Sequence, residues 1–275
     1  MPVSCKDEPE QIPAYIKIEP FVVNSPGGAG WQKITEGWLY IDNLLVGGYA
    51  LPATVPVLDS GNVKVTILPG VRENGLTETP TVYPFFQPFE GNYTLQPAET
   101  TTIQPATQYY PNAVFPWSLD RSTLNNSTIG FENRDGDSSN TFVLVTDGAF
   151  EGRSLKLAVD TAHTLMEVAT ELLDELPVTQ ERPVWLELHY QCDMPFELWI
   201  LGSDGGGIEI SQAVYLFAPY ETWNKIYFNL SPFLIALKQD KYRLFFRASL
   251  PRGSNGQYSQ TAGTVYLDNL RLIHF

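Results

Sequence analysis

One segment in the second half of the chain alternates aromatic and polar side chains in a way that suits ligand binding. In residues 184–192, every second position carries a polar or aromatic residue: Trp185, Glu187, His189 and Gln191. Successive side chains of a β-strand point to opposite faces, so these four are expected on one side of a sheet. The residues between them are mostly apolar and are predicted to form the core face: Val184, Leu186, Leu188, Tyr190 and Cys192.

Two later segments divide in the same way. Glu197 and Trp199 alternate with apolar residues, and Arg243, Phe245 and Arg247 alternate with others. Aromatic rings suit the apolar faces of sugar rings, and charged or amide groups suit sugar hydroxyls. We therefore predict one ligand-binding face, made of Trp185, Glu187, His189, Glu197, Trp199 and Arg247. Trp, Tyr and Arg also anchor protein interfaces, so a protein-contact face is the alternative.

Arrangements typical of catalysis are missing from the sequence. Ser154 does not stand in a Gly-x-Ser-x-Gly motif, and His163, His189 and His274 lie on separate segments. The acidic residues offer many pairs, but none stands in a recognisable glycosidase pattern. We predict a protein that is not an enzyme.

The composition excludes several classes of protein. The chain has 275 residues with 17 Lys and Arg and 31 Asp and Glu, a net charge of −14. Nucleic-acid binders need clustered basic residues, so a nucleic-acid partner is not expected. No apolar run approaches the roughly 20 residues of a membrane-spanning helix. Hydrophobic residues make up 43%, which is enough for sizeable cores.

Short apolar runs between turn residues predict an all-β fold. Gly and Pro number 21 each and are spread along the chain. We predict two tandem β-sandwich domains, at residues 13–110 and 129–275, joined by a junction at residues 111–128 that is rich in aromatic residues and Pro. In the first domain, Asp42-Asn43 predicts a tight turn between two strands. Strands are expected there at Ala14–Val23, Gly37–Ile41, Leu44–Tyr49, Asn62–Leu68, Thr81–Phe86 and Thr101–Pro105.

The second domain is predicted to be the larger sandwich. The segment Leu165–Leu176 fits a helix or a strand, and the β pattern around it favours a strand followed by a turn. Strands are expected at Ile129–Asn133, Ser154–Val159, Val184–Cys192, Phe196–Leu201, Ala213–Ala218, Lys225–Leu230, Tyr242–Leu250 and Thr264–Phe275.

A family resemblance covers this second half. It opens with Gly130-Phe131-Glu132, continues with Gly152-Arg153-Ser154-Leu155-Lys156-Leu157 and closes with Val265-Tyr266-Leu267-Asp268-Asn269-Leu270. This order of motifs resembles jelly-roll carbohydrate-binding modules and their galactose-binding-like relatives. The resemblance implies a structural calcium ion held by a Glu on the opening strand and an Asp on the closing strand, here Glu132 and Asp268. Calcium prefers such oxygen ligands.

The first half carries a shorter resemblance of about 35 residues. Trp38-Leu39-Tyr40-Ile41-Asp42-Asn43 and Gly61-Asn62-Val63-Lys64-Val65 are similar to PEGA-type and related immunoglobulin-like modules of bacterial surface proteins. This domain is expected to act as a spacer or docking module.

The N-terminus predicts a lipid anchor. Val3-Ser4-Cys5 resembles a bacterial lipoprotein cleavage site, and Cys5-Lys6-Asp7-Glu8 resembles the signal that sends Bacteroidota lipoproteins to the cell surface. Residues 1–12 would then be an anchor remnant and a tether, with acyl chains on Cys5 holding the protein to the membrane. The expected location is the extracellular face of the outer membrane.

These interpretations combine into one functional hypothesis with one alternative. The protein is predicted to be a lipoprotein that recognises a glycan through its C-terminal jelly roll. The alternative is an accessory subunit of an outer-membrane transport, secretion or assembly complex, in which the same aromatic face contacts protein. A solvent-open aromatic cleft favours the glycan, and a broad flat apolar patch favours the protein partner.

Overall fold

The computed structural model describes residues 11–24, 29–116, 119, 129–174, 176–177, 179, 181–204 and 207–275. Cys5, the predicted lipidation site, lies outside these residues. The chain divides into two compact units. The first comprises Met1–Val71 and Pro80–Tyr110, and the second comprises Arg72–Thr79 and Pro111–Phe275. The predicted boundaries placed Arg72–Thr79 in the first domain, whereas the structure groups these residues with the second unit.

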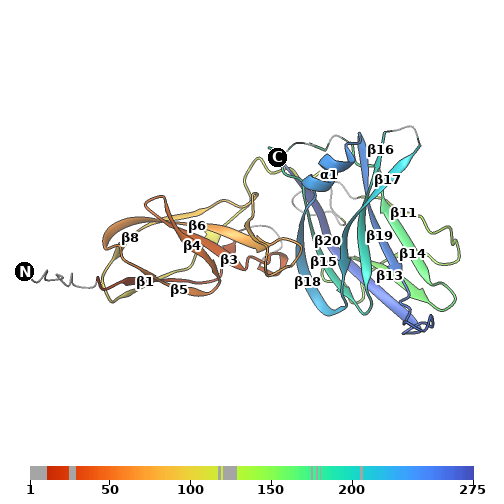
Figure 1. Cartoon of the computed structure of the whole chain (residues 1–275), viewed down its shortest axis with the longest axis horizontal. Coiled ribbons are helices and arrows are strands. Elements are labelled where there is room, and N and C mark those ends of the chain that lie inside the picture. The colour runs from red at the N-terminus through yellow and green to blue at the C-terminus, as the bar shows by residue number, and fades with distance from the viewer. Residues whose placement is uncertain are drawn as a thin grey trace, which may run out of the picture. The chain divides into compact units, whose positions relative to one another are not determined.

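The first unit is a β-sandwich (Figure 1). One sheet has the order β5-β1-β9, and the other has the order β4-β3-β6-β7 with β8 also paired to β6. A two-stranded sheet pairs β10 with β2. The strands are β1 (Ala14–Ile18), β2 (Val22–Val23), β3 (Glu36–Ile41), β4 (Leu44–Ala50), β5 (Ala53–Val57), β6 (Gly61–Arg72), β7 (Pro80–Val82), β8 (Phe89–Leu95), β9 (Thr100–Ile103) and β10 (Ala106–Thr107), and a short 3-10 turn covers Ala29–Trp31.

Alternating apolar residues of the two sheets form the core of this unit. Ile16 and Ile18 from β1 pack in one cluster with Leu39 from β3 and with Val65 and Ile67 from β6, all fully buried. Removing this apolar surface from water is what holds the two sheets together.

The predicted tight turn at Asp42-Asn43 is confirmed. The two residues join β3 to β4 and have φ values of 47° and 70°. Two-residue hairpin turns of this kind require positive φ, which Asp and Asn tolerate better than most residues.

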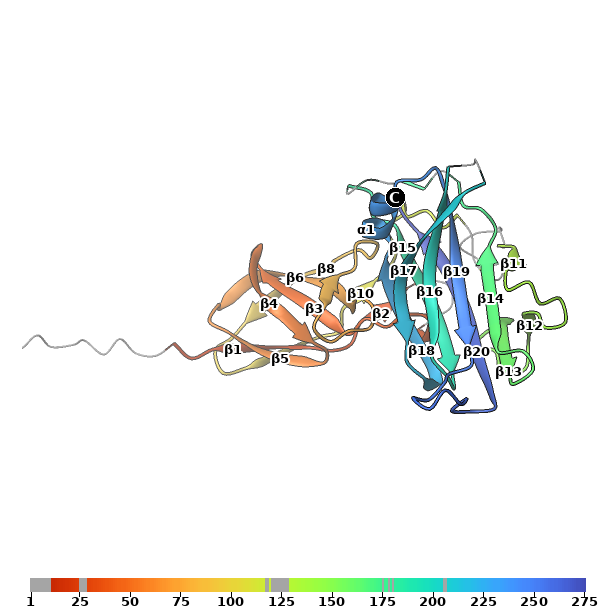
Figure 2. The ribbon, with the colours of Figure 1, turned by 45° about the vertical axis from the view of Figure 1, so that its right-hand side comes forward.

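The second unit is a jelly-roll sandwich of two five-stranded antiparallel sheets (Figure 2). The β16 sheet has the order β11-β14-β19-β16-β17, and the β15 sheet has the order β12-β13-β20-β15-β18. The strands are β11 (Phe131–Asn133), β12 (Val143–Val145), β13 (Ser154–Asp160), β14 (Leu165–Thr170), β15 (Trp185–Cys192), β16 (Phe196–Ser203), β17 (Glu209–Phe217), β18 (Tyr220–Asn229), β19 (Lys241–Ser249) and β20 (Ala262–Ile273).

The predicted core face of this unit is confirmed. Leu186 and Leu188 of β15 share one buried cluster with Leu198 of β16 and Phe246 of β19, each with no exposed surface. The segment Leu165–Thr170 is a strand, as the surrounding β pattern predicted.

Several elements differ from the sequence expectation. Strands β5, β8, β10 and β12 were not predicted, and the expected strand at Thr81–Phe86 is limited to Pro80–Val82. The helix α1 (Ser231–Leu237) was also missed; it has a Pro in its first turn, and Leu234 is buried in the core. Proline is favourable at that position, because its fixed φ suits the helix start. Among the described residues, no helix has the length and apolar character needed to cross a membrane.

Candidate functional site

The outward face of the β16 sheet carries a groove. Its volume is about 340 Å³. The neighbouring positions of these strands point the other way, into the core, so the groove follows directly from the alternation of the strands. The lining combines aromatic, aliphatic and charged side chains: Arg134, Glu167, Trp199, Leu201, Glu209, Ser211, Phe245 and Arg247.

Strand register brings the aromatic and charged residues of the groove together in rows. Trp199 of β16 lies directly opposite Phe245 of β19. One row along, Arg247 lies opposite Glu197 of β16 on one side and Glu167 of β14 on the other. Side chains that face one another in neighbouring strands lie within contact range, so the register alone builds a mixed aromatic and charged surface.

Two short polar contacts fix this surface. The Nε of Arg247 lies 2.9 Å from Oε1 of Glu167. The indole Nε1 of Trp199 donates a 2.6 Å hydrogen bond to Oε2 of Glu197. Each carboxylate keeps further lone pairs that can accept hydrogen bonds, and the guanidinium keeps further N–H donors.

A β-bulge lies beside Trp199. The register between β16 and β17 shifts there, so Leu198 pairs with Tyr215 while Trp199 pairs with Ala213. Bulges bend the strand and redirect side chains, and they are common next to binding sites. A second hollow of about 290 Å³ lies at this bulge, lined by Glu197, Trp199, Ala213, Val214, Tyr215 and Leu216. Trp199 therefore lines both depressions, and its partner Glu197 lines the second.

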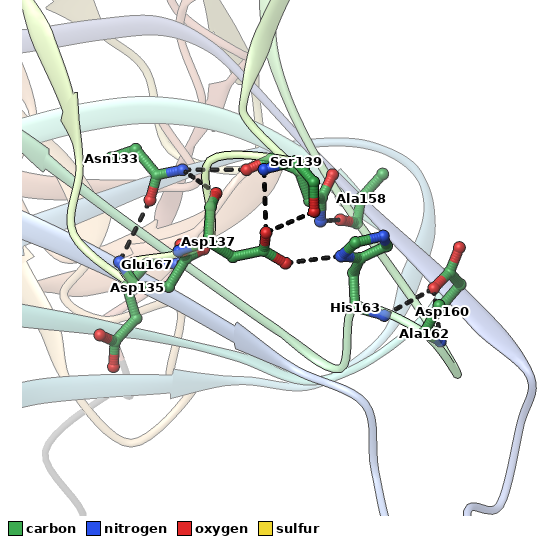
Figure 3. Close-up of polar contacts among 10 residues, drawn as sticks. Asn133, Asp135, Asp137, Ser139, Ala158, Asp160, Ala162, His163 and Glu167 are labelled. Carbon is green, nitrogen blue, oxygen red and sulfur yellow. Dashed lines mark hydrogen bonds and ion pairs between the residues drawn. The ribbon is translucent and has the colours of Figure 1, made fainter.

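A series of Asx turns positions Arg134 at the edge of the groove. In each turn a side-chain oxygen accepts a hydrogen bond from the backbone N–H two residues ahead (Figure 3). Asn133 Oδ1 accepts from the N–H of Asp135 at 3.1 Å, and Asp135 Oδ1 accepts from the N–H of Asp137 at 2.7 Å. Asp137 Oδ1 accepts from the N–H of Ser139 at 2.9 Å. Asp135 also accepts from the backbone N–H of Glu167, at 3.3 Å. Asn and Asp side chains favour such turns, because they hydrogen-bond to backbone N–H groups two residues ahead.

An ion pair ties this loop to the turn between β13 and β14. Nδ1 of His163 lies 2.5 Å from Oδ2 of Asp137 (Figure 3). The hydrogen bond that the His163 ring donates to Asp137 raises the pKa of His163 above its ordinary value, and the nearby carboxylates of Asp160 and Asp135 add to this effect. Hydrogen bonds from Ser139 and His163 hold the pKa of Asp137 well below its usual range.

The structure separates the six predicted ligand-binding residues into two groups. Glu197, Trp199 and Arg247 lie on the β16 sheet at the groove and its neighbouring hollow. Trp185, Glu187 and His189 lie on β15, in the other sheet, with exposures of 3%, 0% and 2%. The prediction of one continuous face is therefore wrong. The alternation correctly predicted which residues of each strand lie on the same face. It does not indicate which strands belong to the same sheet.

The buried group on β15 is held by its own contacts. Oε2 of Glu187 accepts from Nζ of Lys225 and from a guanidinium nitrogen of Arg271, both at 2.8 Å. Burial lowers the pKa of Lys225 to about 8, against the opposing effect of Glu187. The His189 ring stacks on Phe150 with their centroids 4.1 Å apart. Glu187 is therefore structural, because its carboxylate is directed at two buried cations.

The predicted calcium pair is also not brought together. Glu132 lies on β11 in the β16 sheet, whereas Asp268 lies on β20 in the β15 sheet. Oδ2 of Asp268 already accepts hydrogen bonds from the N–H groups of Phe150 and Glu151 and from the hydroxyl of Ser154. Burial raises the pKa of Asp268 above its usual range despite these bonds.

Glu132 pairs with arginines instead, so a shared calcium site at these two residues is wrong. Within the part of the chain that the structure describes, no group of three or more His, Cys, Asp or Glu side chains is placed to hold a metal ion.

Sequence reasoning missed six of the eight groove residues: Arg134, Glu167, Leu201, Glu209, Ser211 and Phe245. Phe245 was recognised as sharing a face with Arg247, and this alternation could have placed it in the site. Arg134, Glu167 and Glu209 gave no comparable signal, because the contacts that bring them to the groove are long-range.

Comparisons with known proteins concern the fold. No protein-family model matches the chain, and no curated protein matches it. A solved structure from work on the promiscuous specificity of β-sandwich carbohydrate-binding modules has a TM-score of 0.38 and 13% identity, covering 87% of this chain and 85% of that chain.

Two other solved structures match about half of this chain. A family 11 carbohydrate-binding module of a cellulosomal cellulase of Clostridium thermocellum has a TM-score of 0.36 and 13% identity, covering 52% of this chain and 86% of that chain. The enzymatically active domain of tailspike protein 4 of bacteriophage CBA120 has a TM-score of 0.36 and 15% identity, covering 54% and 19%. Likenesses this distant carry no argument about function, which rests on the groove itself.

Proposed function

We propose that this chain is a non-catalytic glycan-binding protein whose site is the groove of the β16 sheet. The observation that carries the proposal is the pairing of Trp199 with Phe245 across two strands, flanked by Glu167 and Arg247. Pyranose rings have apolar faces and polar edges, and this groove offers aromatic surface between hydrogen-bonding groups.

The charges of the groove favour a neutral ligand. Arg247 is paired with Glu167, and Arg134 is paired with Glu209. A sugar hydroxyl both donates and accepts, so it can bridge a carboxylate and a guanidinium without disturbing the charge balance.

The mixed lining also favours a glycan over a protein partner. A protein-docking face is expected to be broad and apolar. The groove instead places four charged side chains, Arg134, Glu167, Glu209 and Arg247, around its aromatic residues.

The test is binding of the full chain to six neutral polysaccharides: barley β-glucan, wheat arabinoxylan, potato galactan, konjac glucomannan, dextran and yeast mannan. Affinity gel electrophoresis would detect retention, with isothermal titration to follow. We expect retention by at least one, lost in Trp199→Ala and kept in the control Trp223→Ala. Retention by none of the six would overturn the proposal. Equal loss in both variants would place the binding elsewhere.

The cellular location of the protein is a separate proposal. Cys5 in its lipoprotein-like context supports anchoring at the outer surface of the cell. Expression of the precursor with radiolabelled palmitate would test this. We expect label in the wild type and none in Cys5→Ala, and an unlabelled wild type would contradict the anchor.

A further inference from the structure

Four charged side chains form a closed ring at one end of the groove. They are Glu132 and Arg134 at β11, Glu209 at the start of β17, and Arg243 in β19. Arg243 lies 3.1 Å from Glu132 and 3.3 Å from Glu209. Arg134 lies 3.6 Å from the same oxygen of Glu132 and also contacts Glu209. Each carboxylate therefore touches both guanidinium groups, and we call this ring the charged quartet.

The quartet joins the two opposite edges of the β16 sheet. Strands β11 and β17 are the first and last of its five strands. Neighbouring strands lie about 4.8 Å apart, so the edges of a flat sheet of this size would be roughly 19 Å apart. A direct contact between Arg134 and Glu209 therefore requires the sheet to curl, so that its edges approach each other above Arg243.

The register places the quartet and the second hollow on opposite sides of the pair Trp199 and Phe245, because Arg243 lies opposite Leu201 and Glu197 lies opposite Arg247. Two members of the quartet, Arg134 and Glu209, also line the groove. On the far side of Trp199 the surface continues into the second hollow, at Glu197 and Leu216, where Leu216 is 64% exposed. A chain lying along this path would pass over Trp199 and meet the quartet.

From this arrangement we infer that the groove binds the end of a neutral glycan chain, an inference that rests on the proposed function. A terminal sugar has a free hydroxyl at the position where an internal sugar carries the next residue. The quartet offers carboxylate acceptors and guanidinium donors to that hydroxyl, and its two pairs of charges cancel. An internal sugar would instead drive the continuing chain into the quartet.

The experiment compares intact and shortened forms of the same six polysaccharides. Limited digestion with endo-acting hydrolases multiplies the chain ends per gram without changing the sugar. Isothermal titration of the full chain should give at least tenfold stronger binding per gram for the digest than for the intact polymer. Equal binding per gram would overturn end recognition and leave glycan binding standing. No binding of either form would remove both proposals.

Variants of the quartet supply the second readout. Arg134→Ala removes the exposed bridge between the edges, and Glu209→Gln keeps the shape while removing the charge. The control Arg252→Ala removes an exposed arginine of another loop, which contacts Tyr258. In Arg134→Ala, binding of the intact polymer should rise at least threefold, with a melting temperature near that of the wild type. Glu209→Gln keeps the obstruction, so it should weaken binding of the digest without raising binding of the intact polymer. Unchanged polymer binding in folded Arg134→Ala would overturn the inference.

Discussion

Each sheet of the second unit has a strand in which a Trp and a Glu stand at alternate positions, but the two pairs differ in exposure. Strand β15 presents Trp185 and Glu187 away from the core, and strand β16 presents Glu197 and Trp199. The first pair is buried, whereas the second borders an open groove. A tryptophan and a carboxylate at alternate positions therefore define an outward face, but they do not define a binding face.

The charges of the two faces differ as well. On the β15 sheet, one buried carboxylate, Glu187, serves two cations, Lys225 and Arg271. On the β16 sheet, Arg247 faces Glu167 with 41% of its side chain exposed. Buried ions lose their hydration and depend on their partners, whereas exposed ions can exchange a partner for water or ligand. The first arrangement suits structure, and the second suits recognition.

The largest expected effect comes from removing the buried carboxylate charge. Glu187→Gln leaves Lys225 and Arg271 buried without their shared counter-ion. We expect the free energy of unfolding to fall by about 3–5 kcal/mol, the usual cost of breaking a buried pair. Urea unfolding followed by near-UV circular dichroism at pH 7 measures this loss.

The matched control for this change is Glu197→Gln on the other sheet. Glu197 is half-buried and accepts from the Trp199 indole, which an amide oxygen can still do. We expect a loss below about 1 kcal/mol. Equal losses in the two variants would show that the two faces do not differ as described.

Two adjacent phenylalanines of β19 separate the groove from the core. Phe246 is fully buried, whereas Phe245 is half-buried and lines the groove. Phe246→Ala should cost about 3–5 kcal/mol of stability. Phe245→Ala should weaken glycan binding about tenfold, equivalent to about 1.4 kcal/mol, by removing ring contact. Thermal unfolding and isothermal titration distinguish the two variants, and a Phe245→Ala protein with wild-type affinity would place the ligand elsewhere.

The smallest expected effect concerns the loop that carries Arg134. Because the pKa of His163 is raised, its ion pair with Asp137 stabilises the folded state fully below the unfolded value of about 6.5. This contribution is lost as the pH rises through the folded value. NMR titration of the His163 ring should give a midpoint above 6.5 that falls in Asp137→Asn. The same midpoint in both proteins would contradict the ion pair.

Much of the fold was predictable from local patterns. The alternation in residues 184–192 placed Leu186 and Leu188 in the core, and Asp42-Asn43 marked a hairpin turn. The helix at Ser231–Leu237 was not predictable in this way, because it is a short segment whose residue Leu234 is buried by tertiary packing. Three of the six predicted ligand-binding residues lie at the candidate site, since Glu197, Trp199 and Arg247 follow the same alternation.

The sequence by itself determined the β architecture and the two faces of each strand, because both depend on neighbouring residues. Only the tertiary structure decided which outward face stays open. It buried Glu187 against Arg271, 84 residues away, and brought Arg134 to Glu209, 75 residues away. Such contacts depend on how the sheet curls and which strands pair. No local pattern encodes that, so a groove on one sheet and a buried ion cluster on the other arise from similar strands.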